Sequence, residues 1–157
     1  MNSNLQSTQI VAIVVDDEPA NRDFITRLLQ TAGVEVHSAE TGAEVLRLAQ
    51  SLPTLTIALV DHELPDCHGV DLVKAIRKHH PNAVLGMATM HDHRDLIEEA
   101  FDAGADLFLV KPHGFMELYR RISEKPFNAD NLRRLIIDQY GPRSYRGHTR
   151  TVRAVGA

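Results

Sequence analysis

Polar side chains follow four short apolar runs in this chain of 157 residues, at the point where each run ends. Carboxylates, a hydroxyl and an ammonium group can together bind a metal ion and a phosphoryl group. The runs and the side chains after them are residues 10–15 with Asp16 and Asp17, residues 56–60 with Asp61, residues 83–88 with Thr89, and residues 107–110 with Lys111. Because the carboxyl ends of parallel strands share one edge of a sheet, we expect these side chains to meet in one pocket.

Three carboxylates in one pocket would repel one another, and a hard divalent cation such as Mg²⁺ relieves that repulsion. A carboxylate held beside the metal ion can attack a phosphoryl group and form an acyl phosphate. Transfer also needs positive charge and hydrogen-bond donors around the phosphoryl oxygens, which Lys111 and Thr89 can supply. The predicted pocket therefore contains the groups that phosphoryl transfer to a carboxylate requires.

The apolar runs alternate with segments of helical periodicity. We predict helices at residues 19–31, 41–51, 69–79, 92–103 and 115–122, and a further short strand at residues 34–37. Residues 10–15 and 56–60 are almost continuously apolar, as expected of strands that helices cover on both faces. This alternation predicts an α/β fold, a doubly wound five-stranded parallel sheet with five helices.

The last part of the chain differs from the rest in charge and in pattern. Residues 1–125 contain 11 basic and 19 acidic side chains, whereas residues 126–157 contain six arginines against Asp130 and Asp138. We expect the domain itself to cover residues 1–125. Residues 126–140 are predicted to form an extension helix, capped by Asn128 and with an apolar stripe of Leu132, Leu135, Ile136 and Ile137. Residues 141–157 are predicted to be a basic, flexible tail.

Composition restricts the location and the cofactors. The sequence has no apolar stretch long enough to cross a bilayer, and residues 1–9 show no basic region or apolar signal core. We therefore expect a cytoplasmic protein without membrane contact. Cys67 is the only cysteine, which excludes an intrachain disulfide and a thiolate metal cluster. The glycine-rich phosphate loops of nucleotide-binding proteins are absent from the sequence, so we expect no nucleotide site.

Taken together, the motifs at the strand ends resemble the receiver domain of two-component response regulators. They are Asp-Asp-Glu-Pro at 16–19, Asp61 with Leu64-Pro65 and Gly69, Ala88-Thr89, and Ala-Gly-Ala at 103–105 followed by Lys111-Pro112. The resemblance covers residues 9–124. It implies a flavodoxin-like fold, here in a stand-alone, chemotaxis-regulator-like form with a short C-terminal extension.

The resemblance implies a role for each carboxylate and a Mg²⁺ cofactor. Asp61 is the expected phosphoacceptor and also a metal ligand. Asp17 is expected to bind Mg²⁺ directly and Asp16 largely through water. Glu63 is expected to bind the ion through its backbone carbonyl.

The resemblance also implies switch and tuning residues. Thr89 would move toward the phosphoryl oxygen and Lys111 would pair with it, while Phe108 lies at the position of the switch aromatic. The peptide between Lys111 and Pro112 is expected to be cis, which is costly before any residue except proline. Glu63 and His91 occupy positions that modulate hydrolysis of the acyl phosphate in the family. This chain departs from the common pattern at Met90 and His113, where a small residue and Phe are usual.

The same resemblance implies partners. A sensor histidine kinase or a phosphotransfer protein would supply the phosphoryl group, and a downstream protein target would recognise the switched surface. Any catalysis would be self-catalysed phosphotransfer and autodephosphorylation. The domain could act by docking on other proteins, without a part for the extension. Alternatively, the extension could pack on its own domain, or on a second copy of the chain to form a homodimer. The arginines of the tail are only a weak signal for nucleic acid, which we expect to be unlikely as a partner.

Other functions remain as alternatives. A receiver-like interaction module that phosphorylation does not switch would have the same fold. A phosphohydrolase with an aspartate nucleophile would also place Asp61 after a strand, but it needs a second aspartate where this chain has Glu63. Loop histidines, His91 and His93 among them, leave a transition-metal site as a third alternative.

Overall fold

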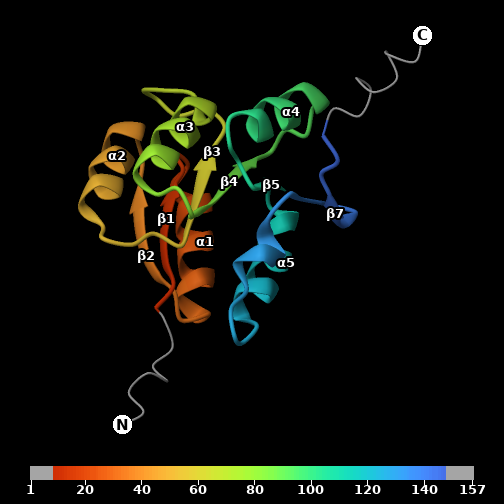
Figure 1. The fold of residues 1–157 in the computed structure, drawn as a ribbon, viewed down its shortest axis with the longest axis horizontal. Coiled ribbons are helices and arrows are strands. Elements are labelled where there is room, and N and C mark those ends of the chain that lie inside the picture. Colours follow the sequence, from red (N-terminus) through yellow and green to blue (C-terminus); the bar gives the residue numbers. More distant parts are fainter. Residues whose placement is uncertain (1–8, 148–157) are drawn as a thin grey trace.

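We describe the fold from a computed structural model, which describes residues 9–147 (Figure 1). Strands and helices alternate from residue 11 to residue 123, and a short extension follows. In chain order the elements are β1 (Val11–Val15), α1 (Pro19–Thr31), β2 (Glu35–Ala39), α2 (Gly42–Ser51), β3 (Ile57–Asp61), α3 (Gly69–His79), β4 (Val84–Thr89), α4 (Arg94–Asp102), β5 (Leu107–Val110), α5 (His113–Ser123), η2 (Ala129–Leu132), β6 (Leu135–Asp138) and β7 (Gly141–Ser144). The predicted helices at 19–31 and 69–79 therefore have the bounds that the sequence indicated.

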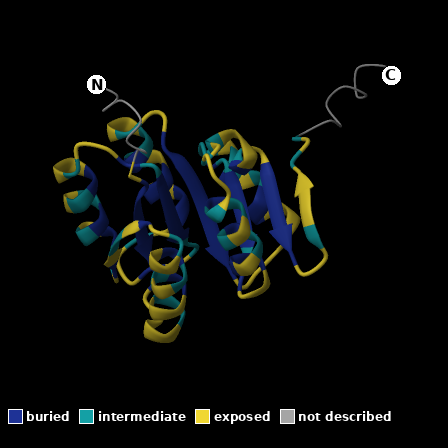
Figure 2. Ribbon diagram, turned by 90° about the horizontal axis from the view of Figure 1, so that it is seen from below, coloured by how far each residue is buried: buried dark blue, intermediate teal, exposed yellow. Residues whose placement is uncertain are grey.

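The strands form one sheet in the order β2-β1-β3-β4-β5-β6-β7. Strands β1 to β6 are parallel, and β7 pairs antiparallel with β6. Helices α1 and α5 pack on one face of the sheet, and α2, α3 and α4 pack on the other (Figure 1). Figure 2 shows the central strands as a buried layer between helices whose outer sides are exposed. The doubly wound α/β prediction is thus confirmed. Within residues 9–147 the sheet has seven strands where five were predicted, because β6 and β7 extend the flavodoxin-like core.

Local signals explain where the helices begin and end. Pro19 is in the first turn of α1, where its missing N–H is not needed. Thr41 and Glu44 form a capping box at the start of α2, because each side chain accepts a bond from the other residue's backbone N–H. Gly33 and Gly104 follow α1 and α4 with φ of 87° and 112°, a conformation that glycine adopts without strain.

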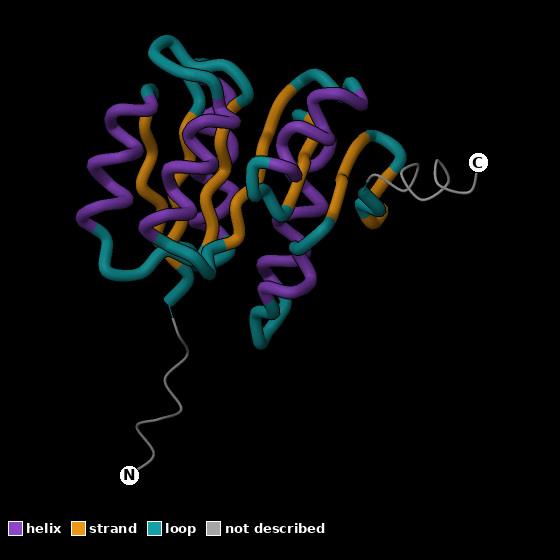
Figure 3. The backbone as a smooth tube through the Cα atoms, turned by 45° about the horizontal axis from the view of Figure 1, so that its top comes forward, coloured by secondary structure: helices purple, strands orange, loops and turns teal. Residues whose placement is uncertain are grey.

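The predicted extension helix at 126–140 is wrong. Only a 3-10 turn, η2, forms after Asn128, whose side chain accepts a bond from the Asp130 N–H. Residues 135–138 instead form strand β6, which pairs with β5 (Figure 3). The physical reason is the free edge of β5: there, alternate residues of an apolar strand can be buried on both faces of the sheet. Leu135 and Ile137 belong to the buried cluster that contains residues of α1 and α5, whereas Ile136 belongs to the cluster that contains residues of α4.

The predicted flexible tail at 141–157 is also wrong in part. Residues 141–144 form β7, an outer strand that is mostly exposed (Figure 2). Tyr145 then stacks on Phe101 of α4, with ring centroids 4.0 Å apart and ring planes within 4° of parallel. The Tyr145 N–H donates to the Arg134 carbonyl, and the Arg134 guanidinium donates to the Tyr145 carbonyl. The remainder of the predicted tail, 148–157, lies outside the described residues.

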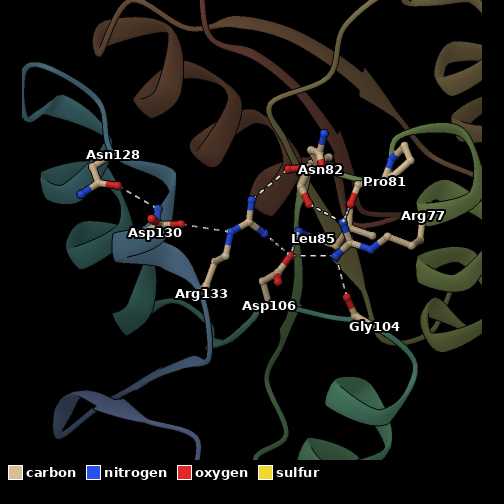
Figure 4. Close-up of polar contacts among 10 residues, drawn as sticks. Arg77, Pro81, Asn82, Leu85, Gly104, Asp106, Asn128, Asp130 and Arg133 are labelled. Carbon is tan, nitrogen blue, oxygen red and sulfur yellow. Dashed lines mark hydrogen bonds and ion pairs between the residues drawn. The ribbon is translucent and has the colours of Figure 1, made fainter.

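A polar network holds the extension to the sheet at the end opposite the predicted pocket (Figure 4). The carboxylate of Asp106 lies between two arginines, 2.8 Å from Arg77 and 3.1 Å from Arg133. The same carboxylate oxygen accepts the backbone N–H of Leu85, and Arg133 also donates to the carbonyl of Asn82. The extension is therefore attached to the domain by backbone pairing, an aromatic stack and a shared ion pair.

Among the residues described, there is no helix that is both long and apolar enough to cross a bilayer. The helices all have one polar side, and their buried residues face the sheet (Figure 2). The buried apolar residues thus form two layers, one on each face of the sheet, between the strands and the helices.

Candidate functional site

The carboxyl ends of β1, β3, β4 and β5 bring the predicted site residues together. They line a cavity of about 290 Å³ that includes Asp16, Asp17, Asp61, Thr89 and Lys111. One carboxylate oxygen from each of the three aspartates lies within 4.8 Å of the others. Among the residues that the structure describes, this is the one group of three or more carboxylate, imidazole or thiol side chains with such spacing. The arrangement suits an oxygen-binding divalent cation, because Mg²⁺ prefers carboxylates, carbonyls and water.

Lys111 supplies the positive charge inside this cavity. Its side chain is 5% exposed, and its Nζ lies 2.6 Å from Asp16 Oδ2 and 3.5 Å from Asp61 Oδ1. A buried ammonium is costly unless it is paired, so Lys111 is held in place by the two carboxylates. Its backbone N–H donates to the carbonyl of Thr89, and its peptide bond to Pro112 is cis, as the resemblance implied.

The carboxyl group of Asp61 has a raised pKa in this cavity. Burial raises the pKa of Asp61 from 3.8 to about 6, against the opposing effect of Lys111. The negative charges of Asp16 and Asp17 also raise this pKa, whereas the bond from the His62 N–H to Asp61 Oδ1, of 2.8 Å, lowers it. A carboxylate that is costly to ionise next to two other carboxylates gains most from a cation or from covalent modification.

Asp16 is fixed by contacts that sequence reasoning did not find. The Glu18 N–H donates to Asp16 Oδ1 at 2.9 Å, and the Arg22 guanidinium donates to the Asp16 carbonyl at 2.7 Å. Arg22 also lies 3.7 Å from Glu40, which follows β2. The contact of Arg22 with Asp16 could have been predicted from the sequence, because a basic residue near the start of α1 lies close to the end of the preceding strand.

The predicted switch residues lie in different surroundings. Thr89 is 2% exposed, lines the cavity, and accepts a bond from the His91 N–H at 3.2 Å. Phe108 is fully buried and pairs in register with Met87 of β4 and Ile136 of β6. The predicted aromatic switch is therefore outside the cavity, one strand away from Thr89.

The predicted tuning residues are at the mouth of the cavity. Glu63 and His91 both line it, together with the exposed side chain of Met90. The ring of His91 lies between those of His62 and His93, with centroids 6.2 Å and 6.0 Å away. The described residues thus place three imidazoles near the cavity, but the ligand spacing that a metal ion needs is found in the aspartate group instead.

The comparisons with known proteins agree with this fold. Residues 12–123 match the family described as the response regulator receiver domain. The response regulator protein PilR of Pseudomonas aeruginosa is 36% identical over 101 residues, which cover 64% of this chain and 22% of PilR. The transcriptional regulatory protein KdpE of Mycobacterium tuberculosis is 33% identical over 112 residues, which cover 71% of this chain and 49% of KdpE. The chain therefore spans half or less of the length of these curated relatives.

Solved structures show the same similarity. The crystal structure of a CheY-like response regulator receiver domain protein from Methanospirillum hungatei superposes with a TM-score of 0.70 at 29% identity. That match covers 80% of this chain and 97% of the solved one. The family match over residues 12–123 and the likeness of the fold to this solved structure together identify a receiver domain of two-component signalling. The chain belongs to the response regulator receiver domain family.

Proposed function

We propose that Asp61 accepts a phosphoryl group in a Mg²⁺-dependent reaction and that this modification switches a protein-interaction surface. The observation that carries the proposal is the contact of Lys111 Nζ with both Asp16 and Asp61 beside three clustered carboxylates. The position of Lys111 next to Asp61, and of Thr89 in the lining of the same cavity, supports roles for both as partners of the phosphoryl oxygens. Receiver domains of response regulators generally use such an acidic pocket for Mg²⁺.

The step is a nucleophilic substitution at phosphorus. A carboxylate oxygen of Asp61 forms a bond to phosphorus, and the bond between phosphorus and the donor breaks. In acetyl phosphate the broken bond is the one to the acetate oxygen, and in a phosphohistidine it is the one to the ring nitrogen. The leaving group keeps the electron pair and takes up a proton as its pKa requires. Asp16, Asp17, Asp61 and the carbonyl of Glu63 would hold Mg²⁺, which neutralises charge on the phosphoryl oxygens.

The switch follows from the contacts that the new charge would change. Lys111 is paired with Asp16 and Asp61, and the phosphoryl oxygens would offer its ammonium a stronger partner. The Thr89 hydroxyl would turn to donate to a phosphoryl oxygen, which would change its contact with the His91 N–H. That N–H belongs to the loop that leads into α4, so we propose that Phe108 and α4 respond to the change. Glu63 and His91 would set the lifetime of the acyl phosphate from the mouth of the cavity.

Response regulators receive phosphoryl groups from histidine kinases and act on downstream targets. For this chain we propose a sensor histidine kinase or phosphotransfer protein as donor, a protein as target, and the cytoplasm as the location. Self-catalysed phosphotransfer and dephosphorylation would be its only chemistry. A homodimer formed through the extension remains an alternative for the output.

The test is phosphorylation by acetyl phosphate with Mg²⁺, followed by intact mass and by mapping of the modified residue. We expect one phosphoryl group on the wild-type protein and none on Asp61→Asn. Asp23→Asn, an exposed position in α1, is the matched control and should be modified like the wild type. Modification of Asp61→Asn to the wild-type extent would refute the assignment. An unmodified wild type, with no response to beryllofluoride, would favour an interaction module that phosphorylation does not switch.

The phosphohydrolase alternative makes a different prediction in the same assay. An enzyme of that kind would release inorganic phosphate from many equivalents of a phosphate ester, with Asp61 regenerated at each turnover. We expect instead a single modification per chain and slow release of phosphate. Glu63 stands where the phosphohydrolase needs its second aspartate, and this difference supports the signalling function.

A further inference from the structure

The loop between β3 and α3, residues 62–68, is attached to the start of α2. Asp66 Oδ1 accepts the backbone N–H of Gly42 at 2.8 Å, and Asp66 Oδ2 accepts that of Ala43 at 3.0 Å. The next N–H of the helix, that of Glu44, is already satisfied by the Thr41 hydroxyl. These bonds lower the pKa of Asp66, since they favour the carboxylate over the acid. A carboxylate from a different loop thus completes the capping of α2.

A second contact joins the same two segments. A Cβ atom at Gly42 would lie 2.4 Å from the Sγ of Cys67 and 3.4 Å from Asp66 Oδ1. The half-buried Cys67 side chain therefore occupies the space that any other residue at position 42 would need. The loop is fixed to α2 both by hydrogen bonds and by close packing.

The other end of the loop is fixed to the phosphoacceptor. The Gly69 N–H donates to the His62 carbonyl at 2.7 Å, and a Cβ atom at Gly69 would lie 2.2 Å from the Asp61 carbonyl oxygen. Within the loop, the Leu64 N–H donates to the Cys67 carbonyl at 3.0 Å. Glu63, which lines the cavity, is therefore held between two attachments, one at Asp61 and one at α2.

We propose that Asp66, together with the contact between Cys67 and Gly42, is a positioning device for the metal site. This proposal rests on the proposed function, in which the Glu63 carbonyl is a ligand of Mg²⁺. A side-chain ligand can adjust through its rotamers, whereas a carbonyl ligand is placed only by the backbone that carries it. Mg²⁺ demands nearly ideal octahedral geometry, so a small displacement of the 62–68 loop weakens binding. Asp66 acts through the loop and does not itself touch the metal ion.

The first test compares Asp66→Ala with Asp71→Ala, which removes a nearby charge from the first turn of α3. We measure the Mg²⁺ dissociation constant, the initial rate of acetyl phosphate modification as a function of Mg²⁺, and the melting temperature. Asp66→Ala should weaken Mg²⁺ binding about tenfold, and saturating Mg²⁺ should restore the rate. Asp66→Asn, which keeps one acceptor oxygen, should lie between Asp66→Ala and the wild type.

A purely structural role for Asp66 would lower the melting temperature and leave the Mg²⁺ dependence unchanged. Equal Mg²⁺ affinities of Asp66→Ala and Asp71→Ala would therefore overturn the proposal. Because Mg²⁺ binding is measured directly, this result differs from failure of the proposed function, in which Mg²⁺ would bind and Asp61 would stay unmodified.

The second test uses the packing contact and does not remove a hydrogen bond. Gly42→Ala forces the Cys67 side chain to move and should weaken Mg²⁺ binding, although alanine is the better helix former. Adding Cys67→Ala removes the obstructing sulfur and should restore the affinity, with Cys67→Ala alone as the control. A double variant that binds Mg²⁺ no better than Gly42→Ala would contradict the role of this contact.

Discussion

Replacement of Asp61 by asparagine should stabilise the folded protein at neutral and alkaline pH in the absence of divalent cations. The Asp61 side chain is 14% exposed, and burial raises its pKa from 3.8 to about 6. The difference between these two values corresponds to a cost of about 3 kcal/mol for keeping the group ionised in the folded state. Asparagine has the same shape, carries no charge and can still accept the His62 N–H.

The direction of the pH dependence follows from proton binding. Between pH 3.8 and about 6 the folded state binds more protons at Asp61 than the unfolded state does, so the stability of the wild type falls as the pH rises through this range. The full cost is present above pH 6. The pKa of about 6 already includes the attraction of Lys111, so we expect Asp61→Asn to gain up to about 3 kcal/mol at about pH 8.

The assay is urea denaturation with a chelator at about pH 8 and about pH 4.5, with Asp23→Asn as control. The advantage of Asp61→Asn should shrink at the lower pH, where the wild-type carboxyl group is largely protonated. Mg²⁺ at pH 8 should stabilise the wild type more than the variant, because binding to the folded state alone raises stability. An advantage that is equal at both pH values, or a less stable variant at pH 8, would refute the role of burial at Asp61.

Three further predictions concern the cavity and the extension. Lys111→Met should lower the rate of Asp61 modification by acetyl phosphate about 100-fold, as for loss of a charge that stabilises a transition state, and a rate within about threefold of wild type would contradict this. Gly69→Ala should destabilise the fold by about 2 kcal/mol or more in urea denaturation, because its Cβ would lie 2.2 Å from the Asp61 carbonyl oxygen; unchanged stability would show that the loop moves freely. Tyr145→Ala should cost about 1–2 kcal/mol through loss of the stack on Phe101 by this partly buried ring, whereas a loss below about 0.5 kcal/mol would mean that the extension is not held at this point.

The sequence predicted correctly those strands and helices whose local apolar pattern is enough to determine their type and position. The apolar runs before Asp61 and Lys111 are strands buried on both faces, and a parallel sheet necessarily brings their ends to one edge. The helix at 69–79 was also predicted with its observed bounds, since its apolar spacing and the break after it are local features. The clustering of the three aspartates with Thr89 and Lys111 in the cavity was therefore predictable before the fold was known, whereas the contributions of Glu18, Asn21 and His62 to its lining were not predicted.

The extension was not predictable in the same way. Leu132, Leu135 and Ile136 have helical spacing, and the periodicity alone favoured a helix. The open edge of β5 decided the outcome, because β6 gains backbone hydrogen bonds and burial on both faces there. The pairing of this four-residue strand with β5 depends on tertiary contacts, so the spacing of apolar residues along the chain cannot predict it.

Contacts between distant segments were invisible for the same reason. The bonds of Asp66 to Gly42 and Ala43 join positions 24 and 23 residues apart, and no periodicity links them. The raised pKa of Asp61 likewise comes from burial and from neighbours on other strands, and neither is visible in its local sequence.

Strand β7 also makes the outer edge of the sheet a poor template for pairing with a strand of another copy. An exposed strand edge offers unpaired N–H and carbonyl groups to another chain, and short strands that contain proline make poor templates. β7 has four residues, and its Pro142, opposite Ile137, has no N–H to give to an incoming strand. A version of the chain cut after residue 125 would expose the edge of β5 instead, with its wholly apolar sequence Leu107–Val110. The extension thus ends the growth of the sheet, and its removal is expected to convert a self-limited fold into one prone to aggregation.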